Sequence, residues 1–123
     1  MNVLKQIVLL VALLFGALHS KGQFTVDTSS DSIDISPGDG ICADSNGECS
    51  LRAAIMESNA ITGLNNIFIP NNEYLITLNV SSENGCVSGD LDITSDLVIQ
   101  GELTRETIIN ADSLDRVFHV LPG

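Results

Sequence analysis

The chain has 123 residues and a formal net charge of −11, from five basic and sixteen acidic side chains. Phosphate backbones and anionic lipid headgroups repel a protein this acidic, so nucleic-acid binding is disfavoured. With no Trp, one Tyr and four Phe, the core has to be built from Ile, Val and Leu, a composition that favours strands.

Residues 1–22 have the layout of a secretory signal peptide. Lys5 supplies the basic start, and residues 7–18 form an apolar or small run that is too short to span a bilayer needing about 20 residues. Small residues at Ser20 and Gly22 suit cleavage before Gln23. We therefore expect a secreted or cell-surface protein without a transmembrane anchor. Its mature net charge is −13, because cleavage removes two lysines and no acidic residue.

The mature chain is long enough for one small domain. A short strand is expected at residues 24–28, where apolar Phe24 and Val26 alternate with polar neighbours. Residues 29–47 are rich in Ser, Asp, Gly and Pro, so we expect a loop there.

One helix is predicted, from Leu51 to about Ala60. Its apolar and small side chains recur at the i, i+3, i+4 and i+7 spacing of a single helix face. Ser50 is the expected N-cap, because its hydroxyl can accept a hydrogen bond from a first-turn amide. Gly63 can adopt the left-handed conformation that closes a helix end.

Beyond the helix, the chain consists of short apolar runs separated by turn residues. The spacings leave no room for crossover helices, which excludes helix-crossover α/β folds. The expected strands are residues 67–69, 74–80, 91–93, 97–99, 107–109 and 117–120. The runs 67–69, 91–93 and 117–119 recur at nearly equal intervals along the chain. This loose repeat favours the coils of a parallel β-helix over an antiparallel sandwich, which the strand lengths also allow.

Two segments resemble the signature of the CSLREA domain family: residues 38–42, with the sequence GDGIC, and residues 49–55, with the sequence CSLRAAI. The resemblance extends over almost the whole mature chain. It implies a mostly β, pectin-lyase-like bacterial protein in which an N-terminal cap with one short α-helix precedes the first coils of a right-handed parallel β-helix. Ser50, Leu51, Arg52 and Ile55 would belong to this structural cap.

The implied organisation is a signal peptide at 1–22, a disulfide-pinned cap at 23–63 and the first β-helix coils at 64–123, which look truncated. Ala53 stands where the family signature has Glu. We expect this departure to be tolerated on an exposed first turn of the helix.

The cysteines are expected to have structural roles. Cys42 and Cys49 lie seven positions apart across a polar turn, and in an exported chain this predicts a disulfide. Cys86 is then either a free thiol or an intermolecular link. Catalysis by a pair of Cys86 and His119 is disfavoured, because His119 lies in an apolar run. We expect His119 to be a strand residue that faces solvent or a core residue whose ring nitrogens are hydrogen-bonded.

Arg52 is one of only three arginines, and we expect it to pair with a loop carboxylate, such as Asp39, Asp44 or Glu48, and to fix the loop onto the cap. Binding of a ligand carboxylate is the alternative. Among the acidic residues, the candidates for Ca²⁺ are Asp90, Asp92 and Asp96, since carboxylate oxygens are the ligands that Ca²⁺ prefers. Solvated turn residues are the simpler interpretation, and no other cofactor and no catalytic residue are expected.

The sequence thus predicts a non-enzymatic extracellular module that caps a parallel β-helix in a secreted or surface-displayed, adhesive protein. Its partners would be further β-helix coils or another protein chain. The alternative is a β-helix protein that binds or cleaves polysaccharide, like a lyase or glycosidase, and that grips a surface glycan through carboxylates and through Asn71, Asn72 and Asn110. The shortage of aromatic residues and of a catalytic base weighs against this alternative.

Overall fold

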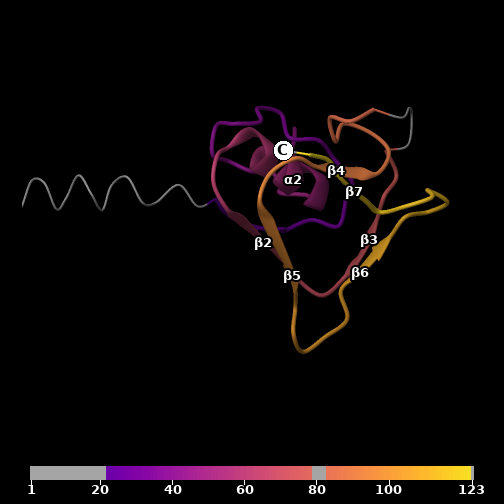
Figure 1. Ribbon diagram of the computed structural model, residues 1–123. Helices are drawn as coiled ribbons and strands as arrows, with labels where there is room; N and C mark the ends of the chain where they lie inside the picture. The colour runs from indigo at the N-terminus through magenta and orange to yellow at the C-terminus, as the bar shows by residue number, and fades with distance from the viewer. Residues whose placement is uncertain (1–21, 79–82, 123) are drawn as a thin grey trace, which may run out of the picture.

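The computed structural model describes residues 22–78 and 83–122. The predicted signal peptide lies outside the described residues except for Gly22, and so does the end of the expected strand 74–80. Within the described residues the protein is mostly β, with one short helix (Figure 1). The elements are β1 (Gln23–Thr25), α2 (Leu51–Ala60), β2 (Asn65–Ile69), β3 (Glu73–Leu75), β4 (Leu91–Ile93), β5 (Leu97–Gly101), β6 (Ile108–Asn110) and β7 (Phe118–Val120).

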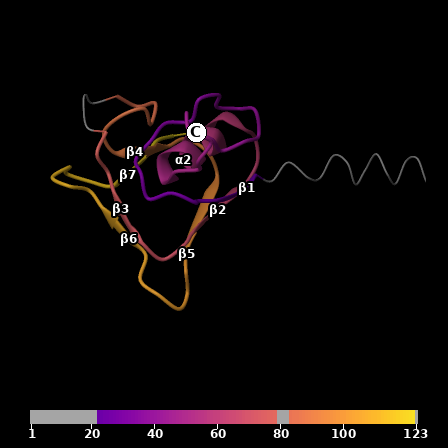
Figure 2. The same cartoon turned by 180° about the vertical axis from the view of Figure 1, so that it is seen from behind.

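The strands form three small, separate sheets with the orders β1-β2-β5, β3-β6 and β4-β7. The chain passes the three sheets in the same order twice, and we call β2, β3 and β4 the first circuit and β5, β6 and β7 the second. The two circuits follow the same three-sided outline in Figure 1 and, from behind, in Figure 2. Every strand pair is parallel, so the antiparallel sandwich is wrong.

The predicted repeat is wrong in its first step, because residues 67–69 and 91–93 lie in different sheets and Ile67 pairs instead with Ile99. Its second step joins the correct strands, since β4 pairs with β7, although the register is shifted by one position and places Leu91 opposite Phe118. Short apolar strands on different sides of one circuit look alike in sequence, and the connections between them differ in length. Spacing alone therefore does not identify the partners.

The helix has the predicted start. Ser50 is its N-cap, and the Ser50 hydroxyl accepts a hydrogen bond from the Ala53 amide at 3.0 Å. The C-cap is Ile61 in an extended conformation, and Gly63 follows shortly after it with φ of 95°. No helix among residues 22–78 and 83–122 is long and apolar enough to cross a membrane.

The first turn of α2 is buried, which overturns the expectation for Ala53. All residues from Leu51 to Ser58 are buried, and Ala53 has no exposed surface. One side of α2 packs against β2 and β4, and the loop between β1 and α2 is hydrogen-bonded to the helix through Ser50 and Glu57. A helix covered by a loop as well as by strands buries more than its one apolar stripe, which is the face that the sequence pattern detects.

The core consists of side chains stacked at paired positions of the sheets. The first-circuit members of these stacks are buried, with exposed fractions of 1% for Ile67, 4% for Tyr74 and 0% for Leu91. Their second-circuit partners, Ile99, Ile109 and Phe118, are only half-buried. The core is therefore closed at the end that carries α2 and less covered at the end formed by the second circuit.

Candidate functional site

Arg52 lies at the centre of a buried polar network that joins three segments of the chain. Its side chain is fully buried and forms a two-pronged ion pair with Asp31, with Nε to Oδ1 at 2.6 Å and Nη2 to Oδ2 at 3.1 Å. The guanidinium also donates to the carbonyl oxygens of Cys86 at 3.1 Å and Gly89 at 2.8 Å. All three guanidinium nitrogens are thus bound within the protein, which excludes a ligand carboxylate at this position.

The expected pairing of Arg52 with a loop carboxylate is confirmed, but the partner is Asp31 and none of the suggested residues Asp39, Asp44 and Glu48. Asp31 Oδ2 also accepts hydrogen bonds from the amides of Thr77 and Leu78, each at 2.8 Å. Asp31 thus ties the loop after β1 both to α2 and to the segment after β3. Nothing in the sequence distinguishes Asp31 from the other loop carboxylates, because this contact depends on how the loop crosses the helix.

Other loop carboxylates bind backbone amides, and a helix carboxylate does the same. Glu57 is fully buried on α2 and accepts hydrogen bonds from the amides of Gly38 at 2.6 Å and Gly40 at 2.5 Å. Both glycines have positive φ, 102° and 86°, a conformation that non-glycine residues rarely adopt. This role of Glu57 was not predicted from the sequence, although an acidic residue at a buried helix position requires a partner.

Asp44 organises the turn between the two bridged cysteines. Its Oδ1 accepts hydrogen bonds from the amides of Glu48 at 3.0 Å and Asn46 at 2.8 Å, and its Oδ2 accepts from the Ser32 hydroxyl at 2.8 Å. The Glu48 amide contributes most to lowering the pKa of Asp44, and the lowering prevails over the opposite effect of burial. The acidic loop is held together by its own carboxylates.

The predicted disulfide is confirmed. Cys42 and Cys49 are bonded with an S–S distance of 2.00 Å and a Cα–Cα distance of 5.1 Å. Cys49 is buried and directly precedes the N-cap Ser50. The bridge therefore attaches the loop to the start of α2.

Cys86 is a free thiol with no exposed surface. Burial raises the pKa of this thiol to about 12, and the opposing effect of nearby Arg52 is smaller. In the folded protein, the full burial of Cys86 excludes an intermolecular link through this thiol, and such a thiol is not a thiolate nucleophile near neutral pH. The backbone of Cys86 has φ of 61°, and its amide donates to Asp92.

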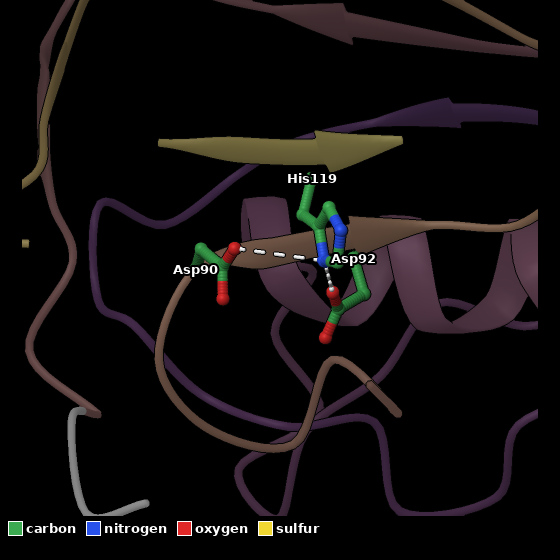
Figure 3. A group of neighbouring side chains, drawn as sticks. All are labelled: Asp90, Asp92 and His119. Atoms are coloured by element: carbon green, nitrogen blue, oxygen red, sulfur yellow. Dashed lines mark hydrogen bonds and ion pairs between the residues drawn. The ribbon is translucent and has the colours of Figure 1, made fainter. Parts of the chain in front are cut away.

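Asp90, Asp92 and His119 are the set of metal-ligating side chains that come together among the described residues (Figure 3). Asp92 on β4 and His119 on β7 are directly paired, with Oδ1 and Nδ1 2.9 Å apart. Asp90 Oδ2 lies 3.9 Å from the same nitrogen. Of the expected Ca²⁺ candidates, Asp96 is exposed and lies outside this group. His119 joins it because the pairing of β4 with β7 brings a residue from the second circuit beside Asp92.

Each member of this cluster already has protein partners. The fully buried Asp92 accepts from His119 and, at 3.2 Å, from the Cys86 amide, and Asp90 is paired with Arg116. Two carboxylates and an imidazole form a donor set that fits a divalent cation. However, Arg116 supplies positive charge at the same place, so a cation would have to displace it. The three side chains and Arg116 therefore already link the two circuits through ionic and hydrogen-bonding contacts. Ca²⁺ binding stays a prediction.

The asparagines predicted to contact glycan lie around the sheet of β3 and β6. The Asn110 side chain donates to Glu73 and accepts from the Asp112 amide, and the Asn72 side chain accepts from the Glu73 amide. Asn71 donates through its backbone to Glu102. Asn72 and Asn110 thus stabilise turns and strand ends.

No protein-family model matches the chain, and no curated protein or solved structure is significantly similar to it. The family resemblance of residues 38–55 stays a prediction.

Proposed function

We propose that the chain is a non-enzymatic structural module of a secreted or surface-displayed, adhesive protein. In this proposal, residues 23–63 cap one end of a right-handed parallel β-helix and residues 64–123 are its first coils, as the resemblance to the CSLREA domain family implies. The Cys42–Cys49 bridge supports the proposed export through the signal peptide at 1–22, because disulfides persist mainly in oxidising compartments.

The observation that carries the proposal is the uneven burial of the stacked side chains. Two circuits of parallel strands pass the same three sheets, which is the path expected of successive coils. The stacks are buried in the first circuit and half-buried in the second. A further coil of short parallel strands would cover Ile99, Ile109 and Phe118 and extend the three ladders by one strand each. The proposed partner at this end is therefore another β-helix coil.

The opposite end supports the role of a cap. The buried helix, the disulfide and the Arg52–Asp31 ion pair fasten a long loop over the core. Caps of this kind are needed in stacked-repeat proteins, because an uncovered end exposes apolar side chains and unpaired strand edges.

A structural role also fits the chemistry of the buried ionisable groups. Arg52, Asp31 and Glu57 bind each other or the backbone, and the Cys86 thiol has a raised pKa of about 12. These groups stabilise one conformation of the cap, and the Cys86 thiol is not a thiolate near neutral pH.

The test is the association state of the oxidised chain, measured by sedimentation velocity over a range of concentrations. We expect reversible self-association through the second-circuit end, because an uncovered stacking end pairs with a second copy when no further coil is present. Ile109→Asp places a charge in the half-buried stack and should abolish this association. Ile108→Asp is the matched control, since Ile108 is the neighbouring residue on β6 and is 46% exposed. The proposed stacking end is contradicted if the chain stays monomeric at every concentration. It is also contradicted if Ile108→Asp abolishes the association as Ile109→Asp does.

A further inference from the structure

The outer face of the sheet β1-β2-β5 is hollowed. Side chains alternate between the two faces of a strand, so Ile67 and Ile69 enter the core while their neighbours on β2 face outward. The resulting hollow measures about 440 Å³, within the range of small-molecule sites. Its outward-facing lining consists of Gln23, Thr25, Asn66, Phe68, Val98 and Gln100.

The register arranges these side chains in two rows across the three strands. One row is formed by Gln23, Asn66 and Val98, and the other by Thr25, Phe68 and Gln100. Two residues along a strand span about 7 Å, and three neighbouring strands span about 10 Å. The rows therefore present a small, regular patch in which the half-buried Phe68 is surrounded by carboxamide and hydroxyl groups.

The polar groups of this patch are free to bind a ligand. Within the part of the chain that the structure describes, the side chains of Thr25, Asn66 and Gln100 form no hydrogen bond with the protein. This separates them from Asn72 and Asn110, whose carboxamides bind neighbouring turns and strands. A carboxamide both donates and accepts hydrogen bonds, as a sugar hydroxyl does.

The patch is uncharged, although the chain carries sixteen acidic residues. No ionisable side chain among the described residues lines the hollow, so neither a cation nor an anionic ligand gains a counter-charge there. A neutral ligand with many hydroxyl groups and an apolar ring face satisfies both the amides and Phe68. Neutral polysaccharides have this chemistry.

We propose that the outer face of β1-β2-β5 binds a segment of a neutral polysaccharide, with a sugar ring against Phe68 and its hydroxyls on Asn66, Gln100 and Thr25. This site differs from the one predicted around Asn71, Asn72 and Asn110. It does not depend on the capping role, since the three strands that form it are present in the chain itself.

The test is affinity electrophoresis of the full oxidised chain in gels containing dextran, galactomannan, xyloglucan or arabinan, with polygalacturonate as the anionic comparison. We expect at least one neutral polysaccharide to retard the protein, with little effect of added salt because the patch is uncharged. Phe68→Leu keeps an apolar side chain but removes the ring, and Gln100→Ala removes one carboxamide. Each should weaken binding about ten-fold or more.

Ile108→Ala is the matched control, because it shortens an exposed apolar side chain on a different sheet, and it should bind as the wild type does. Circular dichroism of each variant separates loss of binding from loss of fold. The proposal is overturned if none of the neutral polysaccharides retards the protein, or if retardation is confined to polygalacturonate and sensitive to salt. It is equally overturned if folded Phe68→Leu and Gln100→Ala variants both bind normally.

Discussion

A fully buried guanidinium loses its hydration, and this cost is offset only where good hydrogen bonds and an opposite charge replace the lost water. Arg52 makes four hydrogen bonds, two to Asp31 and two to backbone carbonyl groups, which together engage all three of its nitrogens. Asp31 is in turn neutralised by Arg52 and bound to two amides. Removal of either partner leaves the other as an uncompensated buried charge, so the two residues should behave as one unit in mutagenesis.

We therefore predict that Arg52→Met lowers the free energy of unfolding by about 3–5 kcal/mol, the usual cost of removing one partner of a buried pair. Urea unfolding followed by circular dichroism measures this loss. Arg105→Met is the control, because the Arg105 side chain is 68% exposed and lies 4.0 Å from Glu102; it should cost less than about 1 kcal/mol. The double variant Asp31→Asn with Arg52→Met should be less destabilised than the sum of the two single variants. Equal unfolding midpoints for Arg52→Met and Arg105→Met would contradict the role of Arg52.

Some individual roles were predictable from the sequence and others were not. The spacing of Cys42 and Cys49 and the position of Ser50 before an apolar run are local signals, and both predictions are confirmed. The Arg52–Asp31 pair and the contact between Asp92 and His119 join residues 21 and 27 positions apart. Such contacts depend on the path of the loop and on the pairing of circuits, which no local pattern encodes.

Among the elements, the loop between β1 and α2 contains several hydrogen bonds from backbone amides to carboxylates. Asp27 accepts from the Cys49 amide, and Asp34 accepts from the amides of Ser36 and Ala43. Together with Asp44, these carboxylates fix the shape of a segment without regular secondary structure. The lowered pKa of Asp44 makes its contribution to the stability of the loop depend on pH.

For Asp44, the direction in which stability changes with pH follows from the lowered pKa of its carboxyl group. Its contribution to stability is present above the ordinary pKa of an aspartate and is lost as the pH falls through the lower pKa of the folded state. We expect Asp44→Asn to reduce stability at neutral pH and to make the decline of the urea midpoint below about pH 5 shallower. Ser32→Ala removes one hydrogen bond to Asp44 and should give an intermediate slope. An Asp44→Asn variant with an unchanged acid profile would show that the carboxylate has no such role.

The strands themselves were predictable, but of their pairings only that of β4 with β7 was predicted. Every expected strand is present, with bounds that differ by a few residues, because apolar runs between turn residues are local features. The pairing depends on connections of unequal length, such as the short one between β4 and β5 and the long one between β3 and β4. The burial of α2 on all sides was missed for a similar reason, since the loop that covers it has no apolar pattern of its own.

At the scale of the whole molecule, the described residues form a core with one fastened end and one less covered end. The fastened end contains α2, the disulfide and the Arg52 network, and the other end consists of the second circuit. Local opening is easiest where few apolar contacts have to be broken. The molecule should therefore open from β7, β6 and β5 toward α2.

Hydrogen exchange measured by mass spectrometry can follow this order. We predict that amides of α2, β2 and β4 exchange most slowly and that those of β5, β6 and β7 exchange through lower-energy openings, because Ile99, Ile109 and Phe118 are only half-buried. Reduction of the Cys42–Cys49 bridge should speed exchange in the loop before α2 and leave the order of the two circuits unchanged. Uniform protection across both circuits would mean that the second-circuit end is already as stable as the core. In that case, the free energy available from stacking a further coil there would be small, which would weaken the case for the proposed cap.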